Sequence, residues 1–473
     1  MSTNTLTKTR FAPSPTGHLH LGNLRTALFN ALLARRDQGV FLLRIEDTDA
    51  ARSREDFAQA LQEDLQWLGL AWQEGPQVGG PQAPYAQAAR GAIYQQYYQQ
   101  LEDAGLAYPC FCSEEALKLS RKAQLSAGRA PRYAGTCARL SATEIEARLA
   151  QGIKPSLRFR VSDEESIAFD DLVRGALYFN GADIGDFIIR RSDGSPAFFF
   201  SNALDDALMG VSHVLRGEDH LTNTPRQLLI LRALDLPMPR YGHISLIMDA
   251  HGAPLSKRLG ALSARALRAQ GFLPLAILNH LARLGHTLDS DALLSFAELA
   301  QAFSESRLGR APARHDETQL QHWQRLAVNA LDETALQQWL EHSEVLQEIP
   351  AAQQQAFLAT IRDNIELPAD ARVWAQRLLV DPLDHEPAAR EAVVQAGAAF
   401  FHSAIKLLDT QPNWDFREFS KTLGQQTGLK GRALFMPLRA ALSGVDHGPE
   451  MARVWQFLGP ERARIRFIQA TDL

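Results

Sequence analysis

The fold of this chain is decided by the stretch RFAPSPTGHLHLGN, which runs from Arg10 to Asn23. Its opening Arg-Phe-Ala predicts a short β-strand, and the prolines that follow must lie in a loop because they cannot donate a backbone hydrogen bond. Apolar residues then recur with helical spacing from Gly22 to Asp37, and Gly39 ends the predicted helix. The stretch therefore predicts a strand, a glycine-containing loop and a helix in direct succession.

The next apolar run, VFLLRI at 40–45, predicts a second strand, which ends in the carboxylate-rich sequence EDTD at 46–49. A buried strand directly after a helix of this length favours a parallel βαβ unit, in which ligands gather at the carboxyl ends of the strands. The alternation resumes later, with helices expected over 201–210 and 222–235 and strands over 212–217 and 243–248. The sequence therefore predicts an α/β protein with a candidate site at the carboxylates that follow the second strand.

An insertion separates the two halves of this predicted sheet, from about Pro81 to Asn180, and it carries all three cysteines. Two capped helices are expected inside it, one opening at Ser113 and one opening at Ser141. Beyond about Gly271 the strand signals disappear, and Leu/Ala-rich helical patterns dominate. We therefore expect a separate inserted lobe and an all-helical C-terminal third.

The composition of the 473 residues, with 45% hydrophobic and 22% charged side chains, is typical of a globular protein of about three domains. Average glycine and proline contents exclude collagen-like and wholly disordered classes. No apolar run approaches the roughly 18 residues of a membrane span, and no apolar signal core opens the chain. Three cysteines cannot form a disulfide framework. We expect a cytoplasmic protein with no membrane partner.

Two segments contain residues that are suited to binding a nucleoside triphosphate. In GHLHLG at 17–22, glycines let a phosphate approach the backbone, and the helix N-terminus offers free N–H groups to it. This segment matches neither the Walker A motif nor the dinucleotide fingerprint. In PLSKR at 254–258, two adjacent cations between glycines suit a loop that closes over a triphosphate. Taken singly, each segment is explained more simply as a structural loop or a solvated basic turn.

Together, the two segments resemble the HIGH and KMSKS signatures of class I aminoacyl-tRNA synthetases. Flanking sequences narrow the resemblance to bacterial glutamyl-tRNA synthetases: TRFA at 9–12, RIEDTD at 44–49, DD at 205–206, LRGEDH at 215–220 and NTPRQ at 223–227. The resemblance covers residues 8–290 closely, and the remainder by length and helical character. It implies a Rossmann-like catalytic domain (1–80 and 181–250), an inserted acceptor-binding lobe (81–180), a stem-contact region (251–320) and helical anticodon-binding domains (321–473).

The resemblance also implies a reaction, that of a glutamate–tRNA ligase that uses ATP and Mg²⁺. The α-carboxylate of L-glutamate attacks the α-phosphorus of ATP, and the mixed anhydride then acylates the terminal adenosine of tRNA-Glu. Catalysis consists of positioning and electrostatic stabilisation, with no protein nucleophile. We expect a monomer, and the sequence leaves open whether tRNA-Gln is also charged.

The family's site positions carry over residue by residue. Those around glutamate correspond to Arg10, Ala12, Ser14, Glu46, Phe198, Asn202 and Arg216. Those around ATP correspond to His20, Gly22, Asn23, His220, Lys257 and Arg258, with His20 and Lys257 the expected catalytic residues. Arginine suits the side-chain carboxylate of glutamate because its guanidinium forms bidentate, charge-assisted pairs. The simpler alternative is that Arg10 and Arg216 only pair with Glu46 and Glu218.

The chain departs from the family pattern at two positions of this expected site. Phe198 stands where the family usually has a tyrosine, so we expect one hydrogen bond to substrate to be absent. Asn23 stands where the HIGH signature implies a second histidine, at a position that glutamyl members commonly fill with a small residue.

The cysteines resemble a zinc knuckle of some bacterial members, in which Cys110, Cys112 and Cys137 would be three ligands. One family pattern takes its fourth ligand from a histidine, and Arg139 occupies that position here. Tyr133 could complete a variant site found in the related glutamyl-queuosine enzyme, because a structural zinc takes four ligands. The alternative is a degenerate knuckle of free buried cysteines.

Other functions share parts of this pattern. Glutamyl-queuosine tRNA-Asp synthetase keeps the chemistry but lacks an anticodon domain, and the helical residues after 320 argue against it. Glutaminyl-tRNA synthetase would carry β-barrels there, where the periodicity predicts helices. A catalytically silent paralogue that only binds tRNA would not require both the GHLHLG and the PLSKR segments. The presence of His20 and Lys257 in them argues against this alternative.

RNA contacts in the C-terminal third can be predicted from charge alone. The whole chain has a net charge of −5, but residues 417–473 hold nine Lys and Arg against five Asp and Glu. A polyanion partner is one explanation for this surplus, and a solvated helical surface is the other. The candidates are Trp323, Arg417, Lys430, Arg432, Arg462, Arg464 and Arg466.

Overall fold

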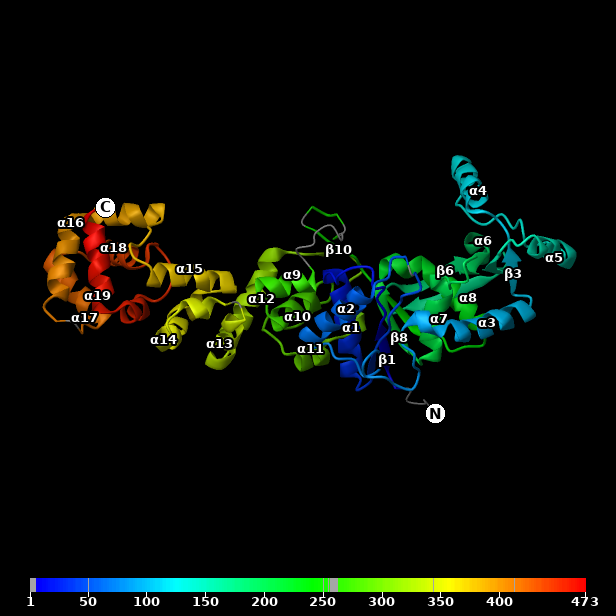
Figure 1. Cartoon of the computed structure of the whole chain (residues 1–473), viewed down its shortest axis with the longest axis horizontal. Helices are drawn as coiled ribbons and strands as arrows, with labels where there is room; N and C mark the ends of the chain where they lie inside the picture. Colours follow the sequence, from blue (N-terminus) through cyan, green and yellow to red (C-terminus); the bar gives the residue numbers. More distant parts are fainter. Residues whose placement is uncertain are drawn as a thin grey trace. The chain divides into compact units, whose positions relative to one another are not determined.

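The computed structural model describes residues 6–49, 51–249, 251–253, 255, 263–342, 344–411 and 413–473 (Figure 1). Packing divides the chain into two compact units. Unit 1 comprises residues 1–267 with 277–317, and unit 2 comprises residues 268–276 with 318–473. No helix in the described ranges is long and apolar enough to cross a lipid bilayer.

A four-stranded parallel sheet forms the centre of unit 1, in the order β2-β1-β8-β9. Its strands are β1 (Lys8–Phe11), β2 (Val40–Leu43), β8 (His213–Gly217) and β9 (Arg240–Ile244). Because β1 and β2 are parallel neighbours, the helix between them, α1 (Leu21–Arg36), is a crossover connection, as the sequence predicts. The α/β fold with a parallel sheet is therefore confirmed.

The second half of the sheet also follows the predicted alternation. It contains α7 (Phe198–Leu208), the 3-10 helix η2 (Glu218–Asn223), α8 (Thr224–Ala233) and the short strand β10 (Ile247–Met248). The last sheet strand was predicted over 243–248 but begins three residues earlier, at Arg240, and ends at Ile244. Pairing with β8 sets both ends, because Arg240 lies opposite His213 and Ile244 opposite Gly217, the first and last residues of β8.

The inserted segment contains both predicted helices, α4 (Glu114–Ser126) and α5 (Ala142–Ala150). Ser113 and Ser141 cap them, and Ser141 forms the predicted capping box with Glu144. The strands of this region were not predicted: a three-stranded antiparallel sheet of β3 (Ala107–Cys110), β4 (Ser156–Phe159) and β7 (Phe187–Arg190), and a hairpin of β5 (Ser166–Asp171) and β6 (Gly175–Asn180). Its remaining helices are η1 (Gln87–Arg90) and α3 (Gly91–Asp103). Helix α6 (Gly181–Ile184) and strand β7 follow the predicted end at Asn180, but β7 completes the three-stranded sheet.

The base of the insertion shares one hydrophobic core with the four-stranded parallel sheet. Leu42 of β2, Val214 of β8 and Tyr241 of β9 pack in the same cluster as Tyr94 and Ile167 of the insertion. The β5–β6 hairpin is joined to β9 by the backbone as well, since Leu172 N donates to Tyr241 O at 2.8 Å. The hairpin therefore lies beside the sheet that carries the site.

The remaining elements of unit 1 and the linking segment are α2 (Glu55–Trp67), α9 (Ala264–Gln270), α10 (Pro274–Arg283), α11 (Phe296–Ala302), η4 (Glu305–Arg307) and β11 (Ala313–Arg314). Strand β11 pairs with β10. No strand follows Arg314 in the described part of the chain, so the predicted helical C-terminal third is confirmed in its secondary structure.

Unit 2 is built from helices: α12 (Glu317–Asn329), α13 (Glu333–Glu341), η5 (Val345–Glu348), α14 (Ala351–Ile361), η6 (Arg362–Asn364), α15 (Pro368–Leu379), α16 (Pro387–Leu408), α17 (Phe416–Thr427), α18 (Arg432–Ser443) and α19 (Met451–Thr471). A single apolar cluster extends through it, from Val328 to Ala470.

Two of the predicted RNA contacts, those of Trp323 and Arg466, are wrong. Trp323 is 4% exposed and Arg466 is 0% exposed, so neither presents its side chain to a ligand at the surface. Arg462 and Arg464 pair with Asp381 and Asp409. The remaining candidates, Arg417, Lys430 and Arg432, are exposed, and their contact with RNA stays a prediction.

Candidate active site

A cavity of about 490 Å³ opens at the carboxyl ends of β1, β2 and β8 in unit 1. Every residue predicted to bind glutamate or ATP within the described ranges lines it: Arg10, Ala12, Ser14, His20, Gly22, Asn23, Glu46, Phe198, Asn202, Arg216 and His220. Lys257 and Arg258 lie outside the described residues. The structure therefore brings the two predicted groups, for glutamate and for ATP, to one cavity.

His20 is the N-cap of α1, and its Nδ1 accepts a hydrogen bond from Gly22 N at 3.1 Å. Since Nδ1 must be unprotonated to accept this bond, the ring proton of a neutral imidazole lies on Nε2, which can donate to an anion. A Cβ at position 22 would lie 3.1 Å from Cε1 of this ring, which accounts for the glycine. The segment therefore presents an imidazole donor next to a helix N-terminus, as a phosphate site requires.

The residues on either side of the 256–262 segment, which lies outside the described part of the chain, contact the elements around this cavity. Leu255 lines the cavity, and its backbone N donates to Ile247 O at 2.9 Å. Ser263 forms a β-bridge with His20, and Ala264 N donates to Leu19 O at 3.0 Å. The backbone that resumes at Ser263 is therefore bonded directly to the segment that contains His20.

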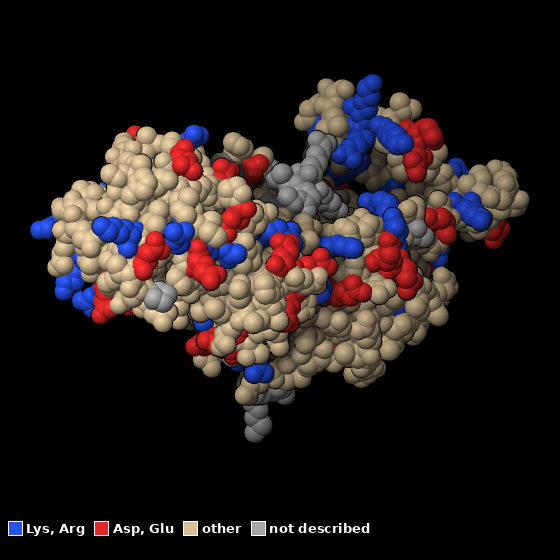
Figure 2. Space-filling model, turned by 60° about the vertical axis from the view of Figure 1, so that its left-hand side comes forward, with Lys and Arg blue, Asp and Glu red and all other residues tan. Residues whose placement is uncertain are grey.

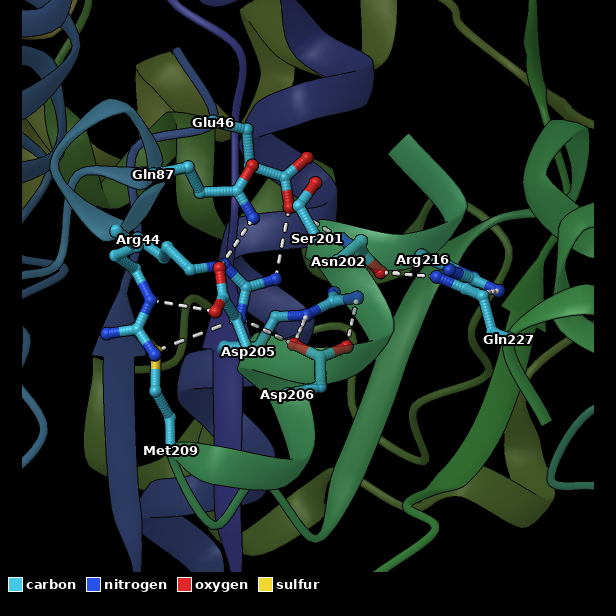
Figure 3. Close-up of polar contacts among 12 residues, drawn as sticks. Arg44, Glu46, Gln87, Ser201, Asn202, Asp205, Asp206, Met209, Arg216 and Gln227 are labelled. Atoms are coloured by element: carbon cyan, nitrogen blue, oxygen red, sulfur yellow. Dashed lines mark hydrogen bonds and ion pairs between the residues drawn. The ribbon is translucent and has the colours of Figure 1, made fainter. Parts of the chain in front are cut away.

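Glu46 follows β2 and is 6% exposed (Figure 3). Its Oε1 accepts hydrogen bonds from Arg44 Nη2 at 3.0 Å and from Asn202 Nδ2 at 2.5 Å. Burial raises the pKa of this carboxyl group, and the nearby Arg44 and Arg10 oppose that rise. Among the described residues only Oε1 is engaged, which leaves Oε2 available to a ligand ammonium group.

Arg10 lies at the end of β1 and pairs with Asp206 of α7, from Nε at 3.2 Å and from Nη2 at 3.3 Å. Arg44, which is fully buried, donates to the same carboxylate at 2.7 Å (Figure 3). Burial opposes ionisation of Asp206, but the charges of Arg10 and Arg44 hold its pKa below the usual range. Asp206 is therefore an anion that holds two arginines at the floor of the cavity.

Asp205 anchors the insertion to the same helix. Its carboxylate accepts hydrogen bonds from Gln87 Nε2 at 2.8 Å, Arg90 Nε at 2.7 Å and Tyr94 Oη at 2.7 Å. All four residues are buried. The adjacent aspartates of α7 therefore divide their roles, with Asp206 supporting the site and Asp205 supporting the insertion.

Arg216, at the end of β8, has no carboxylate within ion-pair distance among the described residues, although it is only 4% exposed. Its Nη2 donates to Thr224 Oγ1 at 2.8 Å and Gln227 Oε1 at 2.6 Å, and its Nε donates to His243 Nε2 at 3.1 Å. Nη1 is buried and has no partner in the part of the chain that the structure describes. Burial lowers the pKa of Arg216 to about 10, so the guanidinium is still charged at neutral pH.

The alternative pairing of the two predicted arginines is therefore wrong. Arg10 pairs with Asp206 rather than with Glu46, and Glu218 pairs with Arg174 rather than with Arg216. A buried cation without an anionic partner is costly, and its presence at a cavity wall indicates that a ligand supplies the negative charge.

Phe198 begins α7 and lines the cavity with its ring 5.3 Å from that of His220, at an interplanar angle of 31°. Burial lowers the pKa of His220 to about 4, so this imidazole is neutral at pH 7. The pair therefore forms an uncharged, flat part of the wall, which suits an apolar ligand face better than a phosphate.

The three cysteines meet in the insertion, where their sulfur atoms all lie within 4.8 Å of one another. Cys112 Sγ is 3.7 Å from Cys137 Sγ, and Tyr133 Oη lies 3.4 Å from both Cys110 Sγ and Cys112 Sγ. Arg158 donates from Nε to Cys110 Sγ at 3.1 Å and lies 3.7 Å from the Tyr133 ring centroid. Burial opposes ionisation, but these hydrogen bonds lower the pKa of Cys110 to about 7.

Sequence reasoning missed several residues that support the site. Arg44, Asp206, Thr224 and Gln227 stand inside quoted family segments, yet nothing in one sequence assigns them a role. His243 and Asp171 carried no signal at all, because their relation to Arg216 depends on strand register and on the position of the hairpin.

Two known domain families match this chain. Residues 7–322 match the family described as "tRNA synthetases class I (E and Q), catalytic domain". Residues 296–471 match "Anticodon binding domain". A helical anticodon-binding domain is what the glutamyl-queuosine alternative lacks, so that alternative is set aside.

Individual relatives agree over the full length. The chain is 57% identical to "Glutamate--tRNA ligase 2" of Alkalilimnicola ehrlichii, covering 100% of this chain and 99% of the relative, and 56% identical to that of Nitrosococcus oceani, covering 99% of each. The glutamate–tRNA synthetase structure of Elizabethkingia anophelis superposes with a TM-score of 0.88 at 27% identity, covering 99% of this chain and 100% of that one. With its cavity, its two signature segments and these matches, the chain belongs to the glutamate–tRNA ligase family of class I aminoacyl-tRNA synthetases.

Proposed function

We propose that this protein activates L-glutamate with ATP and transfers it to the terminal adenosine of tRNA-Glu. The observation that carries the proposal is Arg216, a buried guanidinium that lines the cavity with one unpartnered nitrogen and no anionic neighbour in the described chain. A ligand carboxylate would complete its hydrogen bonding and balance its charge.

Glutamate fits the polarity of the cavity. Glu46 Oε2 would receive the α-ammonium group, Arg216 Nη1 would donate to the γ-carboxylate, and Arg10 would lie near the α-carboxylate. Glutamine lacks the negative charge that Arg216 requires, and aspartate is shorter by one methylene. The same geometry therefore supports selection of glutamate over both.

The reaction would proceed by direct displacement. The α-carboxylate attacks the α-phosphorus of ATP, pyrophosphate leaves, and the 2′ or 3′ oxygen of the terminal ribose then takes the glutamyl group while AMP leaves. His20 Nε2 and the start of α1 would donate hydrogen bonds to the phosphates, and Lys257 would neutralise the leaving pyrophosphate. Class I synthetases use Mg²⁺ with ATP, and when bound it shares the phosphate charge.

The insertion is the proposed contact for the tRNA acceptor end. Its helix α4 carries exposed Lys118, Arg121 and Lys122, and Lys and Arg side chains gather on this projecting part of the insertion (Figure 2). Such a surface binds phosphates without reading sequence. The anticodon would be read by unit 2, where Arg417, Lys430 and Arg432 are exposed.

The decisive experiment is charging of purified tRNA-Glu and tRNA-Gln with labelled glutamate, side by side. We expect tRNA-Glu to be charged, and the second tRNA determines whether the enzyme also accepts tRNA-Gln. Lys257→Ala should abolish tRNA-dependent ATP–pyrophosphate exchange while tRNA binding survives, and Lys406→Ala, at an exposed position of α16, is the matched control. tRNA binding by the wild-type protein without any exchange would identify a catalytically silent paralogue instead.

The cysteine cluster fits a structural zinc ion. Zn–S distances of about 2.3 Å at a tetrahedral centre place sulfur atoms about 3.8 Å apart, and Cys112 and Cys137 are separated by 3.7 Å. Cys110, Cys112, Cys137 and Tyr133 would be the four ligands, with Arg158 compensating their negative charge. The metal would fix the fold of the insertion and take no part in the reaction.

Metal analysis of the full-length protein tests this assignment. We expect one equivalent of zinc, and Cys137→Ser should release it and lower the melting temperature of the insertion. Ser141→Ala, which removes only a helix cap nearby, is the control that keeps the metal. Zinc well below one equivalent in the wild-type protein would leave three free thiols as the correct description.

A further inference from the structure

The guanidinium of Arg216 is held by a chain of buried polar groups that extends away from the cavity. His243, on β9, is 0% exposed and lies opposite Arg216 in the register of β8 and β9. Its Nδ1 lies 2.5 Å from Oδ2 of Asp171, at the end of β5. A carboxylate of the inserted hairpin is thus connected through one imidazole to the arginine at the cavity wall.

The hydrogen bonds fix which nitrogen of His243 carries the proton. The Nε of arginine can only donate, so His243 Nε2, 3.1 Å away, must accept. Thr224 Oγ1, which accepts from Arg216 Nη2 at 2.8 Å, lies 3.0 Å from the same nitrogen. The proton of the neutral ring therefore lies on Nδ1 and is donated to Asp171.

Asp171 is held rigidly in this role. Its Oδ1 accepts hydrogen bonds from three backbone nitrogens, those of Val173 at 2.9 Å, Arg174 at 2.8 Å and His243 at 3.2 Å. Oδ2 is then left for the imidazole. A carboxylate that fixes the tautomer of a histidine in this way also fixes the orientation of whatever the histidine binds.

We propose that Asp171 and His243 are positioning residues for glutamate: they hold Arg216 in the orientation that leaves Nη1 for the substrate carboxylate. The inference rests on the proposed function of Arg216 as the partner of the substrate. Gln227 completes the arrangement on the other side, because it accepts from Arg216 Nη2 and donates to Asn202, which donates to Glu46. The groups at both ends of the bound glutamate would thus belong to one hydrogen-bonded chain.

The isosteric variant Asp171→Asn exchanges donor and acceptor along this series of hydrogen bonds and keeps the size of the side chain. Three backbone N–H groups face the Oδ1 position, so the amide oxygen must occupy that position and the NH₂ group must face His243 Nδ1. The ring proton is then forced onto Nε2, directly against the N–H of Arg216. The guanidinium must rotate or lose its partner, and glutamate binding should weaken.

The test measures steady-state aminoacylation of tRNA-Glu by the full-length protein. Asp171→Asn should raise the KM for glutamate about tenfold or more, the equivalent of one hydrogen bond to a charged group. The KM for ATP should stay at its wild-type value. Asp170→Asn, at the exposed neighbouring position of the same strand, is the matched control.

A second pair of variants keeps the proposal falsifiable if Asp171→Asn does not fold. His243→Gln retains an acceptor for Arg216 and a donor for Asp171, so its glutamate KM should stay within about threefold of wild type. His243→Leu removes both and should raise the KM for glutamate alone. Equal kinetics for the two variants, or unchanged glutamate KM in Asp171→Asn, would overturn the proposal.

The outcome is separable from that of the proposed function. Failure of the wild-type protein to charge tRNA-Glu would refute the function itself. Normal charging by the wild type, combined with parallel changes of both KM values and of the melting temperature in the variants, would assign Asp171 and His243 a purely structural role and refute only the positioning.

Discussion

Arg216 of unit 1 and Arg466 of unit 2 are both buried, at 4% and 0% exposure, yet they are bonded in opposite ways. Arg466 donates from Nε to Asp381, from Nη1 to Leu442 O and from Nη2 to Arg377 O, so every guanidinium nitrogen has a partner. Among the described residues, Arg216 has only neutral hydrogen-bond partners, and its Nη1 has none.

Because these two buried arginines have such different partners, burial alone does not identify a ligand-binding cation. A structural arginine brings its own anion and carbonyl oxygens, because an unpaired buried charge would otherwise destabilise the fold. A ligand-binding arginine keeps an unsatisfied donor at a cavity wall, and the protein accepts the cost in the unliganded state. Arg44 also has one buried nitrogen without a partner among the described residues, but it pairs with Asp206 and Glu46. The absence of an anionic partner, together with an unsatisfied donor at a cavity wall, therefore separates the two roles.

The largest expected effect is on catalysis. Arg216→Gln should lower kcat/KM for glutamate about a thousandfold, or about 4 kcal/mol, because the substrate carboxylate loses its charged partner. The free energy of unfolding should be unchanged or higher, since an unpaired buried charge is removed. Urea unfolding and charging kinetics on the same preparation measure both. A variant that loses stability and keeps its activity would reverse the roles assigned to the two arginines.

Arg466→Gln should show the opposite pattern. The variant leaves carbonyl groups of Arg377 and Leu442 without their donor, so we expect unit 2 to lose about 3 kcal/mol of unfolding free energy. The KM for glutamate should not change. Denaturant unfolding with and without glutamate checks this, and a raised glutamate KM would show that Arg466 affects the site.

A buried histidine away from the cavity extends the comparison to pH. Burial, followed by the neighbouring His315, lowers the pKa of His280 to about 3. The unfolded chain takes up this proton below about pH 6.5 and the folded chain does not, so stability is complete above 6.5 and falls with acidification, by about 2 kcal/mol at pH 5. His280→Asn should flatten this slope relative to His402→Asn, an exposed control. Equal slopes in the two variants would contradict the assignment.

The smallest expected effect concerns the wall of the cavity. Phe198→Tyr would restore the hydroxyl that the family usually has there, and we expect the KM for glutamate to fall about threefold to fivefold, or about 1 kcal/mol. Phe199→Tyr is the neighbouring control, since the ring of Phe199 packs on Phe187 instead. An unchanged KM in both variants would show that the hydroxyl has no role in this enzyme.

The sequence predicted well what is encoded locally. The strand, loop and helix of residues 10–37 follow from proline chemistry and helical spacing, and motif positions placed eleven described residues on one cavity. The capping box at Ser141 was likewise predicted, because its two partners are three residues apart in the chain.

What the sequence could not provide depends on tertiary contacts. Strands such as β3 and β4 are four residues long, too short for alternation to appear above chance. Arg466 was predicted to contact RNA from its charge alone, but its side chain is buried, and composition does not indicate burial. The link from Asp171 to Arg216 joins residues 45 positions apart through a third residue, and only the register of two strands places them together.

The β5–β6 hairpin has a consequence for protein engineering. Although it belongs to the insertion in sequence, it delivers Asp171 to the imidazole behind the amino-acid cavity. Chimeras that exchange the whole insertion between synthetases would thereby exchange part of the machinery for choosing the amino acid. A graft that ends before Ser166 would keep the host's own hairpin and, with it, the host's substrate preference.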